Sequence, residues 1–272
     1  MTTITAKVIA DSIHDGHRLT TLELHYPRII LAELNTHRMF SRNTASSRAI
    51  PVSKIMENVI DDPYIPVIWQ MNQPGMFSTT NASDEVSDKA TEIWLDTMQD
   101  VISGAKKLSA IGIHKQFVNR LLEPFGHVNT VLSSTEWDNF FKLRIAPDAQ
   151  PEIRILATEI KKAIDNSKPV EMKVGEWHIP YILDEEREKY DIETLKKIST
   201  SRLARTSYFS HTTKKLSDPE EDIPFHDRLD KNGHYSPFEH IATPSYRFNS
   251  ESNFKGWAQY RKFREHEKAG LL

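Results

Sequence analysis

The alternation of hydrophobic and polar residues predicts two strands at the beginning of the chain and a helix directly after them. Residues 4–13 are rich in isoleucine, valine and alanine, and over residues 17–26 Leu22 and Leu24 alternate with polar neighbours, a pattern typical of strands. Residues 27–38 open on a proline and continue with helix-forming residues, so they predict a helix after the second strand.

Apolar residues at helical spacing predict longer helices in the middle of the chain. They recur every three or four positions over residues 86–108, 114–122, 133–144 and 151–164. Ser133 and Glu136 form a capping-box pattern that predicts the start of the third of these helices. Between the first predicted helix and this region, residues 53–83 are rich in proline and predict an ordered excursion over the surface.

The last third of the chain has a weaker pattern. Residues 184–197 are highly charged, residues 210–222 predict a loop, and residues 232–248 predict a turn, a short helix and a strand. This mixture of strands and helices predicts an α+β fold.

Composition and charge restrict the class of protein. The chain has 272 residues, of which 38% are hydrophobic and 27% charged, so it can bury a core. With 35 basic and 38 acidic residues, no overall field would attract nucleic acid or an anionic membrane. No apolar run approaches the roughly 20 residues of a membrane span, so we expect a cytoplasmic protein. The absence of cysteine excludes thiolate zinc sites and cysteine nucleophiles.

One polar segment stands out from this ordinary background. Residues 36–50, THRMFSRNTASSRAI, follow neither the helical nor the strand period. They combine guanidinium groups, which bind phosphate through two parallel hydrogen bonds, with hydroxyl side chains, which can bond phosphate and sugar oxygens. The segment therefore predicts a local nucleotide-phosphate site; its candidate residues are Arg38, Ser41, Asn43, Ser46, Ser47 and Arg48.

Two further arginines follow helical patterns. Arg120 precedes a proline, and Arg144 lies at the end of a predicted helix. Taken alone, either arginine is better explained by a surface ion pair or by interaction with a helix dipole than by ligand binding.

The common nucleotide-binding and hydrolase motifs are absent from the sequence, including G-x-G-x-x-G, the phosphate-binding G-x-x-x-x-G-K-[ST] and G-x-S-x-G. His234, Glu239 and His240 are possible metal ligands by type, but their spacing matches no metal motif. The sequence therefore predicts no metal site.

Residues 36–48 resemble the signature of flavin-dependent thymidylate synthases: arginine, histidine, arginine, seven residues, serine, and a further arginine two places on. The matching residues are His37, Arg38, Ser46 and Arg48. Two places depart from the family pattern, because Thr36 replaces the first arginine and Thr44 replaces the usual glutamate.

Other segments resemble further parts of the same family. NFFKLRIAPDAQPEI implies that Asn139 contacts the flavin and that Arg144 binds the substrate base, while NRLLEP implies that Arg120 binds the nucleotide together with Ser46, Ser47 and Arg48. ARTSYFS and NGHYSPFEHIA resemble the segments on the flavin and folate side. The residues that the resemblance assigns to cofactor binding are His37, Arg38, Asn43, Asn139, Ser207, His234, Ser236 and Glu239.

The order of these segments differs from the usual family order, in which the last two precede the signature. The resemblance therefore implies a single catalytic domain over residues 1–272 with a flavin-dependent thymidylate synthase-like fold, a mixed sheet, long helices and circularly permuted segments. Residues 243–264 resemble a second version of the strand and helix before the signature, with Gln259 and Arg261 available to replace contacts missing at Glu33 and Thr36.

The resemblance also implies a reaction. Reduced FAD would deliver hydride to dUMP, 5,10-methylenetetrahydrofolate would supply the carbon for dTMP, and NADPH would reduce the flavin again. Arg144 would be the catalytic residue, because a guanidinium at the pyrimidine edge stabilises developing negative charge. The family builds its sites between subunits of a homotetramer. Two alternatives remain open, a pyrimidine nucleotide hydroxymethylase on the same scaffold and a non-catalytic nucleotide-binding paralogue.

Overall fold

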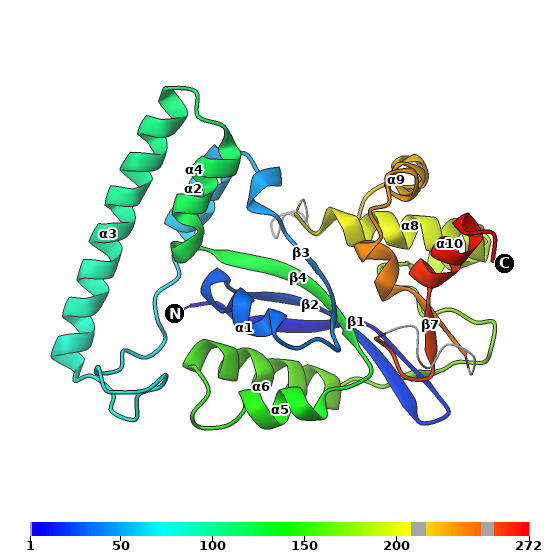
Figure 1. The fold of residues 1–272 in the computed structure, drawn as a ribbon, viewed down its shortest axis with the longest axis horizontal. Coiled ribbons are helices and arrows are strands. Elements are labelled where there is room, and N and C mark those ends of the chain that lie inside the picture. Colours follow the sequence, from blue (N-terminus) through cyan, green and yellow to red (C-terminus); the bar gives the residue numbers. More distant parts are fainter. Residues whose placement is uncertain (1, 208–215, 246–252, 272) are drawn as a thin grey trace.

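A five-stranded mixed sheet forms the centre of the protein (Figure 1). The computed structural model describes residues 2–207, 216–245 and 253–271. The strand order is β3-β4-β2-β1-β5; β5 runs parallel to β1, and the other neighbours are antiparallel. The strands are β1 (Thr5–His14), β2 (His17–Pro27), β3 (Ser41–Thr44), β4 (His127–Ser134) and β5 (Val170–Glu171). The two strands predicted at the beginning of the chain are confirmed as β1 and β2.

The hydrophobic pattern does not predict β4, because buried hydroxyl groups interrupt its apolar residues. Thr130 and Ser133 are buried, and their hydroxyls bond those of Tyr26 at 2.8 Å and Thr21 at 2.6 Å on β2. Hydroxyl groups that bond each other can be buried at little cost. The partly polar strand β4 can therefore lie inside the sheet, between β3 and β2. The predicted helix start at Ser133 is wrong, because Ser133 belongs to β4 and helix α5 spans Asp138–Arg144.

Helices α5 and α6 (Pro151–Asp165) cover one face of the sheet (Figure 1). The predicted spacing over residues 151–164 is confirmed, since α6 buries one stripe against Leu22 and Leu24 of β2. Complete burial of such a side chain contributes roughly 1.5–3 kcal/mol. The buried stripe consists of Ile153, Leu156, Ala157, Ile160 and Ile164.

A second group of helices stands beside the end of the sheet, and its long helix α3 lies away from the strands (Figure 1). These helices share a core that includes Val59, Met98, Ile102, Val118 and Leu122. The helices are α2 (Val52–Asp61), α3 (Asp84–Ala110) and α4 (Lys115–Leu122), followed by the 3-10 turn η3 (Glu123–Phe125). The excursion predicted over residues 53–83 therefore begins as a helix. The helices predicted for α3 and α4 are confirmed.

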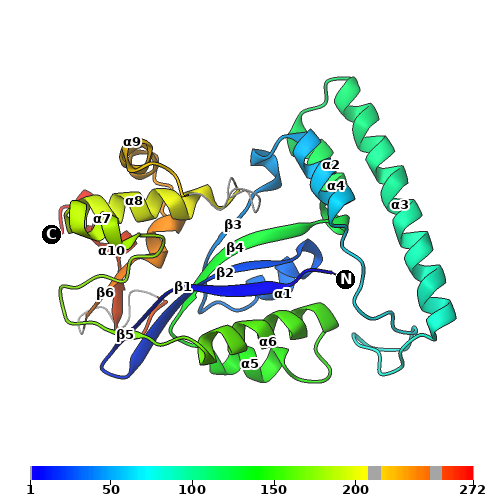
Figure 2. The same ribbon diagram turned by 180° about the vertical axis from the view of Figure 1, so that it is seen from behind.

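The C-terminal elements gather at the opposite end of the sheet from α3 (Figure 2). Arg202 holds them together from a fully buried position, donating to Glu186 at 2.6 and 2.7 Å and to Asp222 at 3.1 Å. The elements are α7 (Asp184–Lys189), α8 (Ile192–Ala204), the 3-10 turn η4 (Arg205–Ser207), α9 (Pro219–Lys231), the 3-10 helix η5 (Ser236–His240), β6 (Ala242–Pro244), β7 (Trp257–Gln259) and α10 (Tyr260–Lys268).

Predictions for this region hold in part. The loop predicted over residues 210–222 is wrong at its end, since α9 starts at Pro219; residues 208–215 lie outside the described part. The turn, short helix and strand predicted over residues 232–248 are confirmed as far as Ser245. The α+β prediction is confirmed. Within the described residues, no helix combines the length and apolar character needed to cross a membrane.

Candidate active site

The polar segment of residues 36–50 consists of a turn, a short edge strand and a 3-10 turn, which explains why it has no single hydrophobic period. The 3-10 turn η1 (Arg28–Ile30) and helix α1 (Leu31–Asn35) precede this segment. The segment itself contains β3 and then the 3-10 turn η2 (Ser47–Ala49). The helix predicted over residues 27–38 is thus shorter than expected. Arg42 closes the turn between α1 and β3 by donating to the carbonyls of Leu34 at 3.2 Å and His37 at 3.1 Å.

Arg144 is joined to the start of this segment. Its Nε donates to Nε2 of His37 at 2.8 Å, and its Nη2 donates to the hydroxyl of Thr36 at 3.1 Å. The same hydroxyl donates to the carbonyl of Glu33 at 2.7 Å. The guanidinium of Arg144 is therefore held in one orientation from two sides.

His37 is buried and neutral. Its ring lies edge-on to Phe140 with the ring centres 4.8 Å apart, and only 7% of the residue is exposed. Burial lowers the pKa of His37 to about 4, and the charges of Arg144 and Arg42 contribute to this shift. Because Nε2 accepts the bond from Arg144, the ring proton resides on Nδ1. His37 therefore orients Arg144 rather than reaching the surface.

Three arginines near the segment are exposed and form no ion pair with any residue that the structure describes. They are Arg38, Arg48 and Arg120. Three exposed guanidinium groups around one polar segment give it a local positive charge, which favours an anionic ligand.

The elements that carry Arg48 and Arg120 lie against each other. Asn119, which is completely buried on α4, donates from Nδ2 to the carbonyls of Ser47 at 2.7 Å and Ile50 at 2.9 Å. Asn119 was not predicted as a site residue; the available signal was an amide among the apolar residues of a helix. η2, which carries Arg48, is therefore fixed to the helix that carries Arg120.

Ser47 is buried, and its hydroxyl donates to Glu123 at 2.6 Å, while Arg28 pairs with the same carboxylate at 3.1 Å. This arrangement fixes the backbone of η2 and occupies the Ser47 hydroxyl. Ser46, directly before it, is half-buried.

The C-terminal segments meet the polar segment at Asn43. Its Nδ2 donates to the carbonyl of Leu203 and to the hydroxyl of Thr206, the latter at 3.3 Å, and its Oδ1 accepts from Ser236 at 3.3 Å. Residues 160 or more positions away are thereby brought to β3. Asn43 and Ser236, both predicted to bind the cofactor, are thus neighbours.

Glu239 lies in the same region and is half-buried. Arg261 pairs with its carboxylate, and Gln259 donates to the carbonyl of Glu239 and to the hydroxyl of Ser41, both at 2.9 Å. Gln259 thus links β7 to β3. That Gln259 and Arg261 replace contacts missing at Glu33 and Thr36 stays a prediction.

A chain of buried polar side chains attaches η5 to the sheet. His178 bonds Ser12 and Thr21, both at 2.8 Å, Thr21 bonds Ser133, and Ser133 bonds Nδ1 of His240 at 2.8 Å. Burial lowers the pKa values of His178 and His240 to about 3, so both rings are neutral. This chain fixes the position of Ser236 and Glu239, which lie on the same 3-10 helix as His240.

The remaining predicted site residues are less constrained. Asn139 on α5, five positions before Arg144, and His234 before η5 are both exposed. Ser207 ends η4, which follows α8 near Asn43, but its side chain lies outside the described part.

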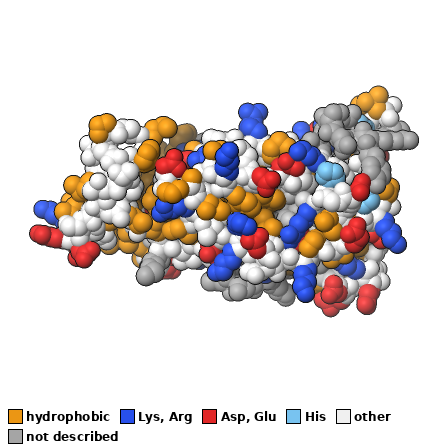
Figure 3. All heavy atoms as spheres, turned by 90° about the horizontal axis from the view of Figure 1, so that it is seen from below, with side chains coloured by type: hydrophobic (Ala, Val, Ile, Leu, Met, Phe, Trp, Pro, Cys, Tyr) orange, Lys and Arg blue, Asp and Glu red, His pale blue; other side chains and the backbone are white. Residues whose placement is uncertain are grey.

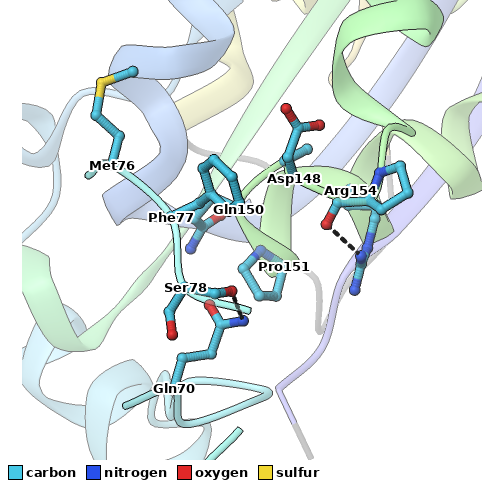
Figure 4. Close-up of a pocket in the computed structure, with 10 residues that line it drawn as sticks. Gln70, Met76, Phe77, Ser78, Asp148, Gln150, Pro151 and Arg154 are labelled. Atoms are coloured by element: carbon cyan, nitrogen blue, oxygen red, sulfur yellow. Dashed lines mark hydrogen bonds between the residues drawn. The ribbon is translucent and has the colours of Figure 1, made fainter. Parts of the chain in front are cut away.

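A surface pocket lies between the loop after α2 and the start of α6 (Figure 4). Gln70, Phe77, Gln150 and Pro151 are among its lining residues, and none of the predicted site residues lines it. The buried carboxylate of Glu152 fixes its wall, accepting from Tyr64 at 2.9 Å and from the Val67 amide at 3.0 Å. The AQPEI segment therefore has a structural role here.

The sequence matches a model of the family described as thymidylate synthase complementing protein over residues 16–170, more than half of the chain. No curated protein matches it. A UMP/dUMP methylase, PolB from Streptomyces cacaoi, is structurally similar. Its structure with 5-Br dUMP aligns with a TM-score of 0.50 and 14% sequence identity, and the alignment covers 60% of this chain and 90% of the PolB chain. Its structure with 5-Br UMP aligns with a TM-score of 0.51 and 16% sequence identity, and the alignment covers 60% of this chain and 89% of the PolB chain.

Likeness at such low identity establishes a common fold, and the fold expected from the resemblance is confirmed. The family match includes the polar segment, Arg120 and Arg144, and ends before Ser207, His234, Ser236 and Glu239. The predicted permutation of segments stays a prediction.

Proposed function

The chain belongs to the thymidylate synthase complementing protein family, and from this premise we propose that it methylates dUMP at C5 to give dTMP in a flavin-dependent reaction. The PolB structures hold brominated dUMP and UMP, which supports a uridine nucleotide as the substrate class. The proposal rests above all on the way Arg144 is held.

Arg144 is the residue proposed to act on the base. Nε and Nη2 are bonded to His37 and Thr36, while Nη1 has no hydrogen-bond partner among the described residues. The rest of the guanidinium can therefore meet the O2 and N3 edge of a pyrimidine in a fixed orientation. A preorganised cation at that edge stabilises negative charge that develops on the ring.

Arg48 and Arg120 are proposed to hold the 5′-phosphate of the nucleotide, with Ser46 beside them. Both arginines are exposed, neither forms an ion pair with a described residue, and Asn119 fixes η2 to α4. The Ser47 hydroxyl already bonds Glu123, so the contribution of Ser47 is proposed to come from its backbone amide.

FAD fits the polar groups that remain. The exposed guanidinium of Arg38 suits a pyrophosphate, and exposed polar side chains are offered by Asn139 on α5 and by His234 and Ser236 at the start of η5. The sequence has no cysteine, so the alternative chemistry that adds a thiolate to uracil C6 is closed to it. When bound, reduced FAD would supply the hydride. The residues proposed to hold or support it are His37, Arg38, Asn43, Asn139, Ser207, His234, Ser236 and Glu239.

The carbon donor and reductant are proposed from family membership, as 5,10-methylenetetrahydrofolate and NADPH. Glu239 lies on η5, which packs on β3, and His234 lies two positions before η5. We propose that this side of the site receives the folate.

We propose a homotetramer with sites between subunits. Hydrophobic side chains are grouped over the half of the molecule that carries α3 (Figure 3). An exposed apolar surface of this kind is typical of an interface between subunits. Exposed apolar residues of α3 and α4 include Val86 and Ile93, with 45% and 58% of their surface exposed, and Phe117 and Leu121, with 61% and 43%.

The test is an absorption spectrum of the purified protein followed by a product assay. We expect flavin bands and, with dUMP, methylenetetrahydrofolate, NADPH and FAD, a product with the mass of dTMP. UMP in place of dUMP determines the sugar preference. A hydroxymethyl product would identify the hydroxymethylase alternative, while a colourless protein that neither binds FAD nor turns over would refute the proposal and favour the non-catalytic paralogue.

A further inference from the structure

Two histidines and an aspartate meet at the end of the central sheet that lies next to α2. His25 is on β2, His127 is the first residue of β4, and Asp62 directly follows α2. Because His25 lies opposite Asn129 in the antiparallel register, His127 is its diagonal neighbour on the same face. The two rings are stacked with their centres 4.9 Å apart and 17° between their planes.

The three side chains direct ligand atoms toward one point. Oδ2 of Asp62 lies 3.9 Å from Nε2 of His25 and 3.6 Å from Nδ1 of His127. One ligand atom from each residue lies within 4.8 Å of the other two. The Asp62 side chain is 46% exposed, whereas those of His25 and His127 are 17% and 5% exposed. The space between the three ligand atoms is therefore bounded by the sheet on the side of the histidines and open to solvent on the side of the Asp62 carboxylate.

Asn129 fixes the tautomer of His25. Its side-chain oxygen lies 2.7 Å from Nδ1 of His25, and an amide oxygen can only accept, so Nδ1 carries the proton. A ring without a proton on Nε2 presents a lone pair toward the Asp62 carboxylate. Two acceptors that face each other repel unless a proton or a metal ion lies between them, and a hydrogen bond from the opposite ring nitrogen is how proteins orient histidine ligands.

We propose that His25 Nε2, His127 Nδ1 and the Asp62 carboxylate bind a divalent transition metal, with zinc as the best match. Two imidazoles and one carboxylate are a common zinc donor set, and water can occupy the open position. With metal–ligand distances near 2.0–2.2 Å, tetrahedral ligand atoms stand about 3.3 Å apart. Rotation of the half-exposed Asp62 side chain can close much of the difference from the present distances.

The metal would have a structural role, since it would join β2, β4 and the end of α2. The backbone carbonyl of Asn129 accepts a hydrogen bond from the amide of Ala45 at 2.9 Å, directly after β3. The metal would therefore fix the strand end that carries the polar segment of the candidate active site. The proposal does not depend on the identity of the substrate.

The test is calorimetric titration of ZnCl2 into full-length protein that has been stripped with chelator and exchanged into metal-free buffer. We expect one zinc per chain and a higher thermal unfolding temperature with zinc. Asp62→Asn keeps the shape of an exposed side chain and should weaken binding at least about 10-fold, the lower end of what even indirect ligand contacts contribute. Bound Co²⁺ should give visible absorption bands that are lost in Asp62→Asn and in His25→Gln.

The matched control is His17→Gln, which removes an exposed imidazole at the other end of β2, where it faces His14 across the hairpin. This variant should bind zinc as the unchanged protein does. Absence of stoichiometric zinc binding, or equal affinity in Asp62→Asn, would overturn the proposal. Loss of binding in His17→Gln alone would place the metal at the hairpin and also overturn it. Circular dichroism of Asp62→Asn without metal verifies that this variant is folded.

Discussion

Nε of Arg144 donates a hydrogen bond to Nε2 of His37 at 2.8 Å, across 107 positions of sequence. This contact joins the two segments with the strongest family resemblance. Thr36 supports it from the other side, and an arginine there could not accept the bond from Nη2, because a guanidinium has no acceptor. The departure of Thr36 from the family signature thus accompanies a specific contact to Arg144.

Arg144→Lys is expected to fold and to retain FAD but to lose dTMP formation. An ammonium on a flexible stem cannot bond His37, Thr36 and the pyrimidine edge together, and loss of one preorganised donor group costs on the order of 100- to 1000-fold in turnover. Flavin reduction by NADPH and product formation are measured separately at saturating dUMP and methylenetetrahydrofolate. Near-normal dTMP formation would exclude Arg144 as the residue that acts on the base, and equal loss of flavin reduction would indicate general damage to the site.

Arg144→Ala is expected to raise the pKa of His37. Burial lowers this pKa to about 4 as the largest cause, and the positive charge of Arg144 is the next. Without that charge the pKa should rise, yet remain below the ordinary 6.5 because the ring stays buried. NMR titration of histidine-labelled protein measures the change. Arg120→Ala serves as the control, because Arg120 is not among the causes of the shift; equal pKa values in all three proteins would contradict the contact.

The chain segments that the sequence predicted correctly are those with a local period. α6 buries one side along its length, and β2 alternates Leu22 and Leu24 with polar residues, so neighbours in sequence suffice. β4 could not be found in this way, because its buried Thr130 and Ser133 are satisfied by hydroxyls of another strand. Its burial depends on contacts that form only in the folded sheet.

The same distinction applies to the candidate site. The sequence identified His37 and Ser47 as candidate site residues, but it did not indicate that both are buried and bonded to Arg144 and Glu123. Asn119 lies in the segment NRLLEP, but the resemblance gives it no role in the site. In the structure it holds η2 against α4. Motif spacing identifies which residues matter, whereas tertiary packing determines whether each of them contacts a ligand or supports a neighbour.

Arg48→Ala is expected to weaken dUMP binding by roughly 1.5–3 kcal/mol, the usual contribution of hydrogen bonds to a charged group, and to leave FAD binding intact. Stability should change little, because Arg48 is exposed and pairs with no carboxylate of the described chain. Calorimetric titration of dUMP measures the difference. Deoxyuridine, which lacks the phosphate, should bind both proteins alike; an unchanged dUMP affinity would show that Arg48 does not contact the phosphate.

FAD binding is expected to be coupled to subunit assembly. The residues proposed to hold FAD come from α5, β3 and η5, and the exposed apolar residues of α3 and α4 provide a surface for association. A ligand that binds only the assembled protein shifts the association equilibrium by mass action. Gel filtration with and without FAD, together with light scattering, measures this shift. A monomer that binds one FAD per chain would contradict shared sites, and Ile93→Glu on α3 should reduce both association and FAD binding.

Stability is expected to decrease as the pH falls below about 6.5, because burial lowers the pKa of several histidines in the folded protein. His37 and His226 are among them, and the largest shifts are those of His178 and His240. Their folded pKa values are lowered to about 3 by burial, whereas an unfolded histidine has a pKa near 6.5. Between these values the unfolded chain binds more protons, so the free energy of unfolding rises with pH and is lost as the pH falls. Each fully buried histidine contributes up to about 1.4 kcal/mol per pH unit in this range.

Urea denaturation at pH 7.5, 6.5 and 5.5 measures the slope of the free energy of unfolding against pH. The pKa of Glu186 is lowered, so these pH values stay above the range in which its protonation weakens the ion pair with Arg202. His17→Gln, which removes an exposed histidine, should leave the slope unchanged. Equal stability at pH 7.5 and 5.5 would show that the two rings become protonated in the folded state, and that the chain of hydrogen bonds from Ser12 to His240 does not persist.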